Sequence, residues 1–206
     1  MYTPRHNQIE DRATLVAFMR AHPFAALVTQ GAEGLRATHL PVVTEEAGDR
    51  VRLLAHLALA NPQWHDFSAG AEVLVIFAEP HAYISPCHYE RAESVPTWNY
   101  AAVHAYGVPV LVEDRAEKHA QQAKLVGLFD AEYAARFPQL SSDYVDRMVA
   151  AIVSFTIEVT RLEARFKLSQ EKLPVERERI IATLESAGNS AAAETARLMR
   201  DHSPSK

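Results

Sequence analysis

The sequence predicts an α+β protein, and three observations lead to that prediction. Short runs of β-prone apolar residues, separated by turns, fill much of the chain between Phe24 and Val112. Helical spacing of apolar residues is confined to the N-terminus, a stretch before the last strand, and the C-terminus. No internal repeat or low-complexity linker divides the 206 residues, so we expect a single domain over residues 1–206. Grouped strands with segregated helices are typical of the α+β class, and short strands joined by turns favour a barrel.

Composition narrows the class of protein further. The chain is 48% hydrophobic and 23% charged, which is ordinary for a globular protein. Its net charge of −5, without any basic run, disfavours a general nucleic-acid binder, since that affinity comes from Lys and Arg. No apolar run reaches the roughly 20 residues of a membrane span, and no signal peptide is visible. With Cys87 as the single cysteine, we expect a cytoplasmic protein that does not contact a membrane.

The first half of the chain predicts one helix, several strands and one short helical turn. Asn7 is the expected N-cap of the helix, with Glu10 as its capping partner and Pro23 at its end. Asn61 followed by proline predicts a short helix that ends at Asp66. The expected strands are residues 24–30, 35–44, 51–56, 72–78 and 82–84.

The second half predicts one long strand, a group of helices and a last strand. In the strand over residues 97–112, one face carries bulky side chains and the other small ones, so we expect something to approach the small face closely. The last strand changes its alternation near Thr160, which indicates a β-bulge. The expected helices are residues 115–129, 131–136 and 142–151, and a C-terminal pair at about residues 175–202.

The end of the second strand offers the first candidate binding residues. Thr38, His39 and Leu40 follow one another there. Strand side chains alternate, so His39 points away from the face that Thr38 and Leu40 share. A histidine in this place either contacts a ligand or is an ordinary residue of an edge strand.

The turn after the third strand is the second candidate, and it carries His56, Ala58 and Asn61. A helix N-terminus presents free N–H groups and the positive end of the helix dipole, both suited to a phosphate. The alternative is that Asn61 only caps its own helix.

Two later segments complete the candidate set. Aromatic residues beside prolines flank one loop, at residues 83–89 and 95–100, and include Trp98 and Asn99. Aromatic rings with a nearby amide can hold a planar ligand, whereas the alternative is a partly buried, stapled loop. Lys167 and Gln170 end the last strand and could hold an anionic group, although a lone lysine is usually solvated.

Other chemistries have weaker support. His81, Cys87, His88 and Glu90 lack the spacing of a four-ligand zinc set, so we expect no metal site. Cys87 and Ser85 lack the surroundings of a nucleophile, and no catalytic residue is identified. Neither a Walker loop nor a dinucleotide-binding glycine motif is present.

Short motifs in a defined order carry a resemblance that no motif carries alone. They include Thr38-His39-Leu40-Pro41, Ala60-Asn61-Pro62, Thr97-Trp98-Asn99-Tyr100 and Lys167-Leu168-Ser169-Gln170. The full set is residues 1–6, 21–23, 27–29, 38–41, 55–58, 60–62, 82–86, 95–107, 161–163 and 167–170. Over about residues 1–185 the chain resembles the PaiB family of FMN-binding, split-barrel transcriptional regulators.

The resemblance implies a six-stranded antiparallel Greek-key split β-barrel with peripheral helices. It also implies a homodimer with FMN, a planar anionic ligand, bound between the subunits, and negative regulation of sporulation and degradative-enzyme genes. Many flavin-oxidase split barrels grip the phosphate with an Arg/Lys pair, which the turn over residues 56–61 lacks. The cofactor-binding residues that the resemblance implies are Thr38, His39, Leu40, His56, Ala58, Asn61, Trp98, Asn99, Lys167 and Gln170.

Two other functions fit the same fold. One is a flavin-dependent oxidoreductase, in which His39 or His104 serves as a proton donor. The other is a haem-binding or haem-degrading protein with a histidine as axial ligand. Direct DNA binding is disfavoured, because no helix-turn-helix is apparent and residues 176–179, which alternate Glu and Arg, predict a solvated face.

Overall fold

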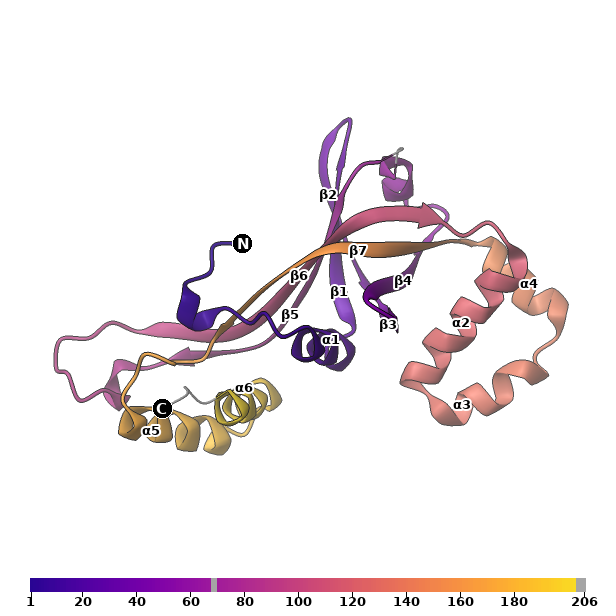
Figure 1. The fold of residues 1–206 in the computed structure, drawn as a ribbon. Helices are drawn as coiled ribbons and strands as arrows, with labels where there is room; N and C mark the ends of the chain where they lie inside the picture. The colour runs from indigo at the N-terminus through magenta and orange to yellow at the C-terminus, as the bar shows by residue number, and fades with distance from the viewer. Residues whose placement is uncertain (68–69, 203–206) are drawn as a thin grey trace. The chain divides into compact units, whose positions relative to one another are not determined.

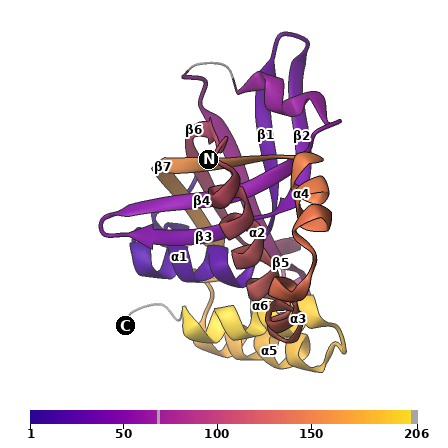
Figure 2. The same ribbon diagram turned by 90° about the vertical axis from the view of Figure 1, so that its right-hand side faces the viewer.

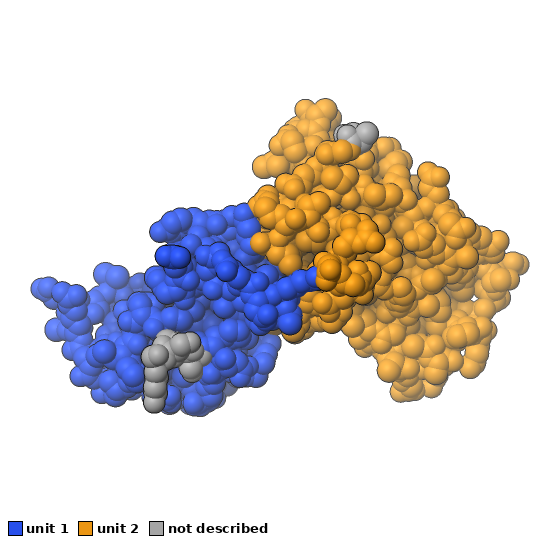
Figure 3. All heavy atoms as spheres, viewed as in Figure 1, with its two compact units in different colours: residues 1–15, 78–103, 163–206 blue, residues 16–77, 104–162 orange. Residues whose placement is uncertain are grey.

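The computed structural model describes residues 1–67 and 70–202 and divides the chain into two compact units. Unit 1 consists of residues 1–15, 78–103 and 163–206, and unit 2 of residues 16–77 and 104–162 (Figure 3). Each unit is therefore assembled from segments far apart in the sequence. The expectation of a single domain over residues 1–206 stays a prediction.

The described residues form one seven-stranded sheet, in the order β2-β1-β5-β6-β7-β4-β3 (Figure 1). In unit 2, β1 pairs antiparallel with β2 and β5, and β4 pairs antiparallel with β3 and β7. β2 and β4 also contact each other although they stand near opposite ends of that order, so this part of the sheet curves back on itself. The strands are β1 (Phe24–Gly31), β2 (Gly34–Pro41), β3 (Val43–Ala47), β4 (Arg50–Ala58), β5 (Val73–Ile84), β6 (Thr97–Leu111) and β7 (Ile152–Lys167).

The fold class is confirmed, but the strand number is seven rather than the six expected. Residues 35–44, expected as one strand, are two strands that meet at Val42. Pro41 has no N–H for a sheet ladder, and the N–H of the buried Val42 donates instead to the carbonyl of Pro23 at 2.8 Å. Glu45 and Glu46, which lie outside the expected strands, then pair with β4 as part of β3.

Several helical segments belong to unit 2, and α1 (Arg12–Ala21) begins in unit 1 and ends in unit 2. The N-cap predicted for α1 is wrong: Asn7 is buried in the turn η1 (Arg5–Asn7), and Asp11 accepts from the Thr14 N–H at 2.8 Å. Gln121 of α2 donates to the carbonyl of Ala55, so α2 lies against β4, as Figure 2 shows. The remaining helices of this unit are α2 (Arg115–Phe129), α3 (Ala131–Arg136), α4 (Ser142–Ala150), η2 (Pro62–Asp66) and η4 (Phe137–Gln139).

In unit 1, two C-terminal helices pack on the ends of β6 and β7. They are α5 (Pro174–Ser186) and α6 (Ser190–Asp201), close to the expected bounds (Figure 1). The predicted solvated face is wrong in part, since Glu176 and Arg177 are each 6% exposed. Arg177 donates to the carbonyls of Leu168 and Met199, which ties the end of β7 to α6. The short 3₁₀ segments η1 and η3 (Pro86–His88) also belong to this unit.

The small face of β6 is closely approached, as expected, but by the chain itself. Asn99, Val103 and Ala105 are at most 1% exposed. A Cβ on Gly107 would lie 2.3 Å from the carbonyl oxygen of Glu158 in β7. A dimer partner or a flat ligand therefore has no room against this face.

Along β7 the buried apolar side chains change from odd-numbered to even-numbered positions, as expected. Phe155 and Ile157 are buried before the change, and Ala164 and Phe166 after it.

Among the residues that the structure describes, no helix combines the length and the apolar character that crossing a bilayer requires.

Candidate functional site

The structure brings two of the candidate residues, Thr38 and Asn61, into direct contact. The Asn61 amide donates to the Thr38 hydroxyl at 3.0 Å, which joins β2 to the turn after β4. The carbonyl oxygen of the same side chain accepts from the Gln63 N–H at 3.0 Å and caps η2. Asn61 therefore caps its own helix and also contacts the β2 candidate, and its role as a ligand contact stays a prediction.

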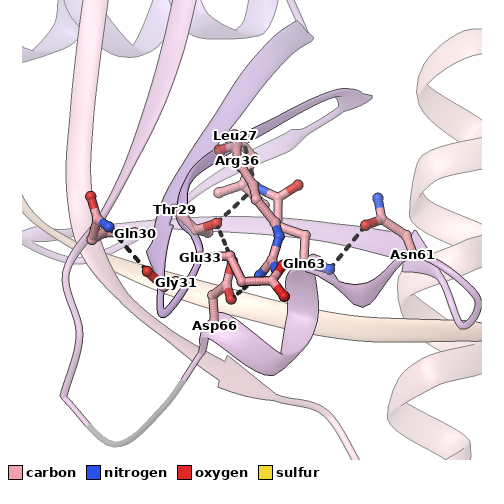
Figure 4. A network of polar contacts seen from close by, with 9 residues as sticks. All are labelled: Leu27, Thr29, Gln30, Gly31, Glu33, Arg36, Asn61, Gln63 and Asp66. Carbon is pink, nitrogen blue, oxygen red and sulfur yellow. Dashed lines mark hydrogen bonds and ion pairs between the residues drawn. The ribbon is translucent and has the colours of Figure 1, made fainter.

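Gln63, which the sequence analysis missed, holds η2 against the first hairpin (Figure 4). It is 1% exposed, and its amide donates to the Leu27 carbonyl at 3.1 Å and the Thr29 hydroxyl at 3.2 Å. A third contact, to the carbonyl of Arg36, is longer at 3.4 Å. The Oε1 atom of Gln63 is buried and has no hydrogen-bond partner within the described residues. Gln63 thus fixes the turn that carries Asn61 and leaves one acceptor unused.

Asp66, also missed, ends the same helix in an ion pair. Its carboxylate accepts from the Thr29 hydroxyl at 2.8 Å and from the guanidinium of Arg36, which also pairs with Glu33 at 2.6 Å (Figure 4). Burial opposes ionisation of Asp66, but the hydrogen bonds from Thr29 and Arg36 outweigh it and keep its pKa below the ordinary value. Arg36 is therefore a cation whose charge is already balanced. Strand alternation, which puts Arg36 on the same face as Thr38, was the signal that could have found it.

His39 and Leu40 point in opposite directions, as expected from alternation. Leu40 is 4% exposed and belongs to the core. His39 is exposed, and its ring stacks on that of Phe24 with centroids 6.2 Å apart. The structure therefore leaves His39 accessible and gives Leu40 a packing role.

His56 is directed toward α2. Its Nδ1 lies 3.4 Å from the amide nitrogen of Gln122, and burial lowers its pKa. A neutral, half-buried histidine contributes no positive charge to an anion. Ala58 lies exposed at the end of β4.

The turn suits a flat apolar group better than a phosphate. Leu59 is 50% exposed, and Ala58 and Ala60 on either side of it are exposed as well. The N–H groups of Leu59, Asn61 and Gln63 are already donated to acceptors within the chain, at 2.8, 2.9 and 3.0 Å. The exposed side chains of this turn are suited to an apolar ring, whereas these three N–H groups are not available to a phosphate.

Two further candidates, Trp98 and Lys167, meet in unit 1. Trp98 is 52% exposed, with ring centroids 5.9 Å from Tyr83 and 5.8 Å from His81. The Lys167 ammonium donates to the Trp98 carbonyl at 3.0 Å and to the hydroxyl of Thr97, and burial lowers its pKa. Unit 1 thus presents an outward aromatic group beside a partly buried cation.

Asn99 and Gln170 have their polar atoms bonded within unit 1. Asn99 is fully buried, accepts from the Ser169 hydroxyl at 3.0 Å and donates to the Met199 sulfur at 3.3 Å. Gln170 accepts from the Leu168 N–H at 2.7 Å. Both side chains fasten the end of β7 within unit 1.

The whole sequence from residue 1 to residue 161 matches the family described as "Putative FMN-binding domain". Solved structures with the same fold include the flavocytochrome Anf3 from Azotobacter vinelandii, with a TM-score of 0.64, 14% identity, and coverage of 80% of this chain and 72% of that one. The FAD and heme binding protein from Mycobacterium smegmatis has a TM-score of 0.61 and 16% identity, covering 89% and 81% of the two chains. The chain belongs to this FMN-binding family and has its split-barrel fold.

A curated relative makes the assignment more specific. The chain is 33% identical over 213 residues to "Protease synthase and sporulation protein PAI 2" (PaiB) of Bacillus subtilis (strain 168), covering 98% of this chain and 97% of the relative. It is also 36% identical over 86 residues to the uncharacterized protein YKL070W of Saccharomyces cerevisiae, over 39% of this chain and 51% of that protein. The expected membership of the PaiB family is confirmed.

Proposed function

We propose that this protein is a flavin-responsive regulator that binds FMN or a closely related planar ligand. The family match over residues 1–161 carries the proposal, because this segment contains the whole β2–β4 candidate region. The name of the B. subtilis relative refers to protease synthesis and sporulation, and it supports a regulatory role over a metabolic one. We also propose a cytoplasmic location, which the single cysteine of the chain supports.

The proposed site has two contributions. Thr38, His39, Ala58 and Asn61 supply one wall, with Leu59 as its apolar surface. A second subunit of a homodimer supplies the aromatic Trp98 and a cation, Lys167. Since Arg36, the cation beside the β4 turn, is already paired with Asp66 and Glu33, Lys167 is the proposed contact for the phosphate. Leu40, His56, Asn99 and Gln170 belong to the same proposed site as supporting residues that position these walls.

Bound flavin would supply a redox-active ring, and the chain's own residues would bind it and shield one face from water. We propose that regulation is indirect, through a ligand or a protein partner. A gel shift on the upstream region of the protein's own gene, showing tight binding at near-physiological salt, would overturn that part.

An absorbance spectrum of the purified protein tests the proposal. A flavin band at about 450 nm that stays with the protein through gel filtration is the expected result. Protein that remains colourless after FMN is added would refute it. A Soret band after haem is added, lost on substitution of one histidine, would identify a haem protein instead.

A pair of cap substitutions tests the location. Asn61→Ala removes the contact with Thr38 and the cap of η2, whereas Asn189→Ala removes only the equivalent cap of α6. We expect flavin affinity to fall about tenfold in the first variant alone. Equal affinity in the two variants would place the flavin elsewhere.

A further inference from the structure

The segment beyond the family match helps to form a cavity that the proposed flavin site does not use. The cavity lies in unit 1 and has a volume of about 700 Å³. One wall is the loop that leads into β6 and the other is the start of α5. Its lining residues are Tyr89, Arg91, Glu93, Ser94, Val95, Glu171, Lys172, Leu173 and Glu176.

A buried carboxylate holds the two walls together. Glu176 is 6% exposed, and it accepts from the Glu90 N–H at 2.8 Å and the Leu173 N–H at 3.0 Å. These two hydrogen bonds hold its pKa below the ordinary value. An ion pair at 2.5 Å between Arg179 and Glu90 adds a second tie. The cavity is therefore organised before any ligand arrives, which lowers the entropic cost of binding.

Charges of both signs face the cavity and are not paired with each other. Within the described residues, Arg91, Glu93 and Glu171 make no side-chain hydrogen bond or ion pair, and Lys172 contacts only the Tyr89 ring, 4.2 Å from its centroid. Cations suit a ligand carboxylate, and carboxylates suit a ligand ammonium group.

The cavity also has apolar surface and one unused polar atom. Val95 is 78% exposed and Leu173 is 54% exposed, although each carries only aliphatic groups. The Tyr89 hydroxyl is buried and lacks a hydrogen-bond partner among the described residues. Native structures leave few such groups unpaired, so an unpaired hydroxyl beside a cavity points to a ligand.

We propose that this cavity binds a small zwitterion, an α-amino acid with an apolar side chain. Arg91 and Lys172 receive its carboxylate, Glu93 and Glu171 receive its ammonium group, and Val95 and Leu173 contact its side chain. A regulator needs a place at which a signal is read, and this cavity is separate from the residues proposed for flavin. The inference does not depend on flavin binding, because every lining residue belongs to unit 1 and none is a proposed flavin contact.

Isothermal titration of the full chain with L-leucine tests the inference. We expect a Kd of about 1 mM or below, as for a solvent-open site with several charge-assisted contacts. Two leucine analogues dissect the recognition: 4-methylpentanoate lacks the ammonium group, and isoamylamine lacks the carboxylate. Each is expected to bind at least about tenfold more weakly, because one pair of charged contacts is lost.

Substitutions locate the binding. Arg91→Gln and Glu171→Gln should each weaken leucine binding about tenfold, whereas Glu178→Gln should not. Glu178 is the matched control, since it is an exposed carboxylate on α5 outside the cavity. A melting curve verifies that each variant is folded.

Three results would overturn the inference. One is the absence of binding heat at about 10 mM leucine, a concentration well above the expected Kd. Another is leucine binding that both cavity variants retain at full strength. The third is equal affinity for leucine and for either analogue, which would show that the cavity does not read a zwitterion.

Discussion

Gln63 is the residue whose removal best tests how the candidate site is held together. Replacing it with leucine deletes the donors to the Leu27 carbonyl and the Thr29 hydroxyl, and a longer third contact. Each buried hydrogen bond contributes about 1 kcal/mol net, so the loss is roughly 2–3 kcal/mol. The substitution also removes the buried, unpaired Oε1, which raises the free energy of unfolding by about 1 kcal/mol and so offsets part of the loss. We expect Gln63→Leu to lower the free energy of unfolding by about 1–2 kcal/mol.

Gln121→Leu provides a control of nearly equal cost. Gln121 is 3% exposed, donates to the carbonyls of Ala55 and Phe155 at 2.7 and 3.2 Å, and also has an unpaired Oε1. It joins α2 to β4 and β7, whereas Gln63 joins η2 to the β1–β2 hairpin. Both variants should therefore be destabilised by a similar amount.

Thermal melts and flavin titrations of the two glutamine variants separate stability from binding. For a chain of this length, 1–2 kcal/mol corresponds to a fall in Tm of roughly 2–8 °C. Only Gln63→Leu should weaken flavin binding, because Gln63 helps to fix the turn that carries Asn61 and Gln121 does not contact it. An unchanged Tm for Gln63→Leu would refute the hydrogen-bond reasoning, and equal flavin loss in both variants would refute the positioning role.

Three further predictions concern packing and protonation. A Cβ on Gly31 would lie 2.2 Å from the Asp66 carboxylate, so Gly31→Ala should lower Tm. Gly127→Ala in α2, where a Cβ would meet nothing within 4 Å beyond the neighbouring helix backbone, should leave Tm unchanged or raise it. Gly107→Ala would push a methyl group against the main chain of β7, and we expect a loss of at least about 2 kcal/mol in a urea melt; a wild-type midpoint would contradict the close approach. Burial lowers the pKa of His56 in the folded state, so unfolding takes up a proton and stability falls as pH drops below about 6.5. His56→Gln should show a smaller fall over that range in urea melts at several pH values, and an unchanged slope would mean that His56 is not the group responsible.

Local sequence signals were sufficient for much of the fold. The helices α2 and α3 begin and end where their patterns predicted, because Asp114 and Asp130 each cap the N–H of the residue three positions on. The same holds for the turn at Asn61, where an amide and a following proline are enough to start η2. Such features depend on residues a few positions apart, so the linear sequence contains their physical cause.

The seventh strand and the buried charges required contacts between distant residues. Val42 separates β2 from β3 because its N–H finds the carbonyl of Pro23, a partner 19 positions away by number. Glu176 and Arg177 look like a solvated pair in sequence. Main-chain groups of Glu90, Leu168 and Met199 satisfy them in the interior of unit 1.

The candidate site likewise depends partly on local sequence signals and partly on contacts between distant residues. The sequence by itself determined the Asn61 cap and the family to which the chain belongs. The tertiary structure decided that Asn61 reaches Thr38, that Gln63 and Asp66 hold the turn, and that His56 faces α2. The physical reason is that alternation and capping fix the direction of a side chain, whereas its partner depends on which strand or helix the fold places opposite to it.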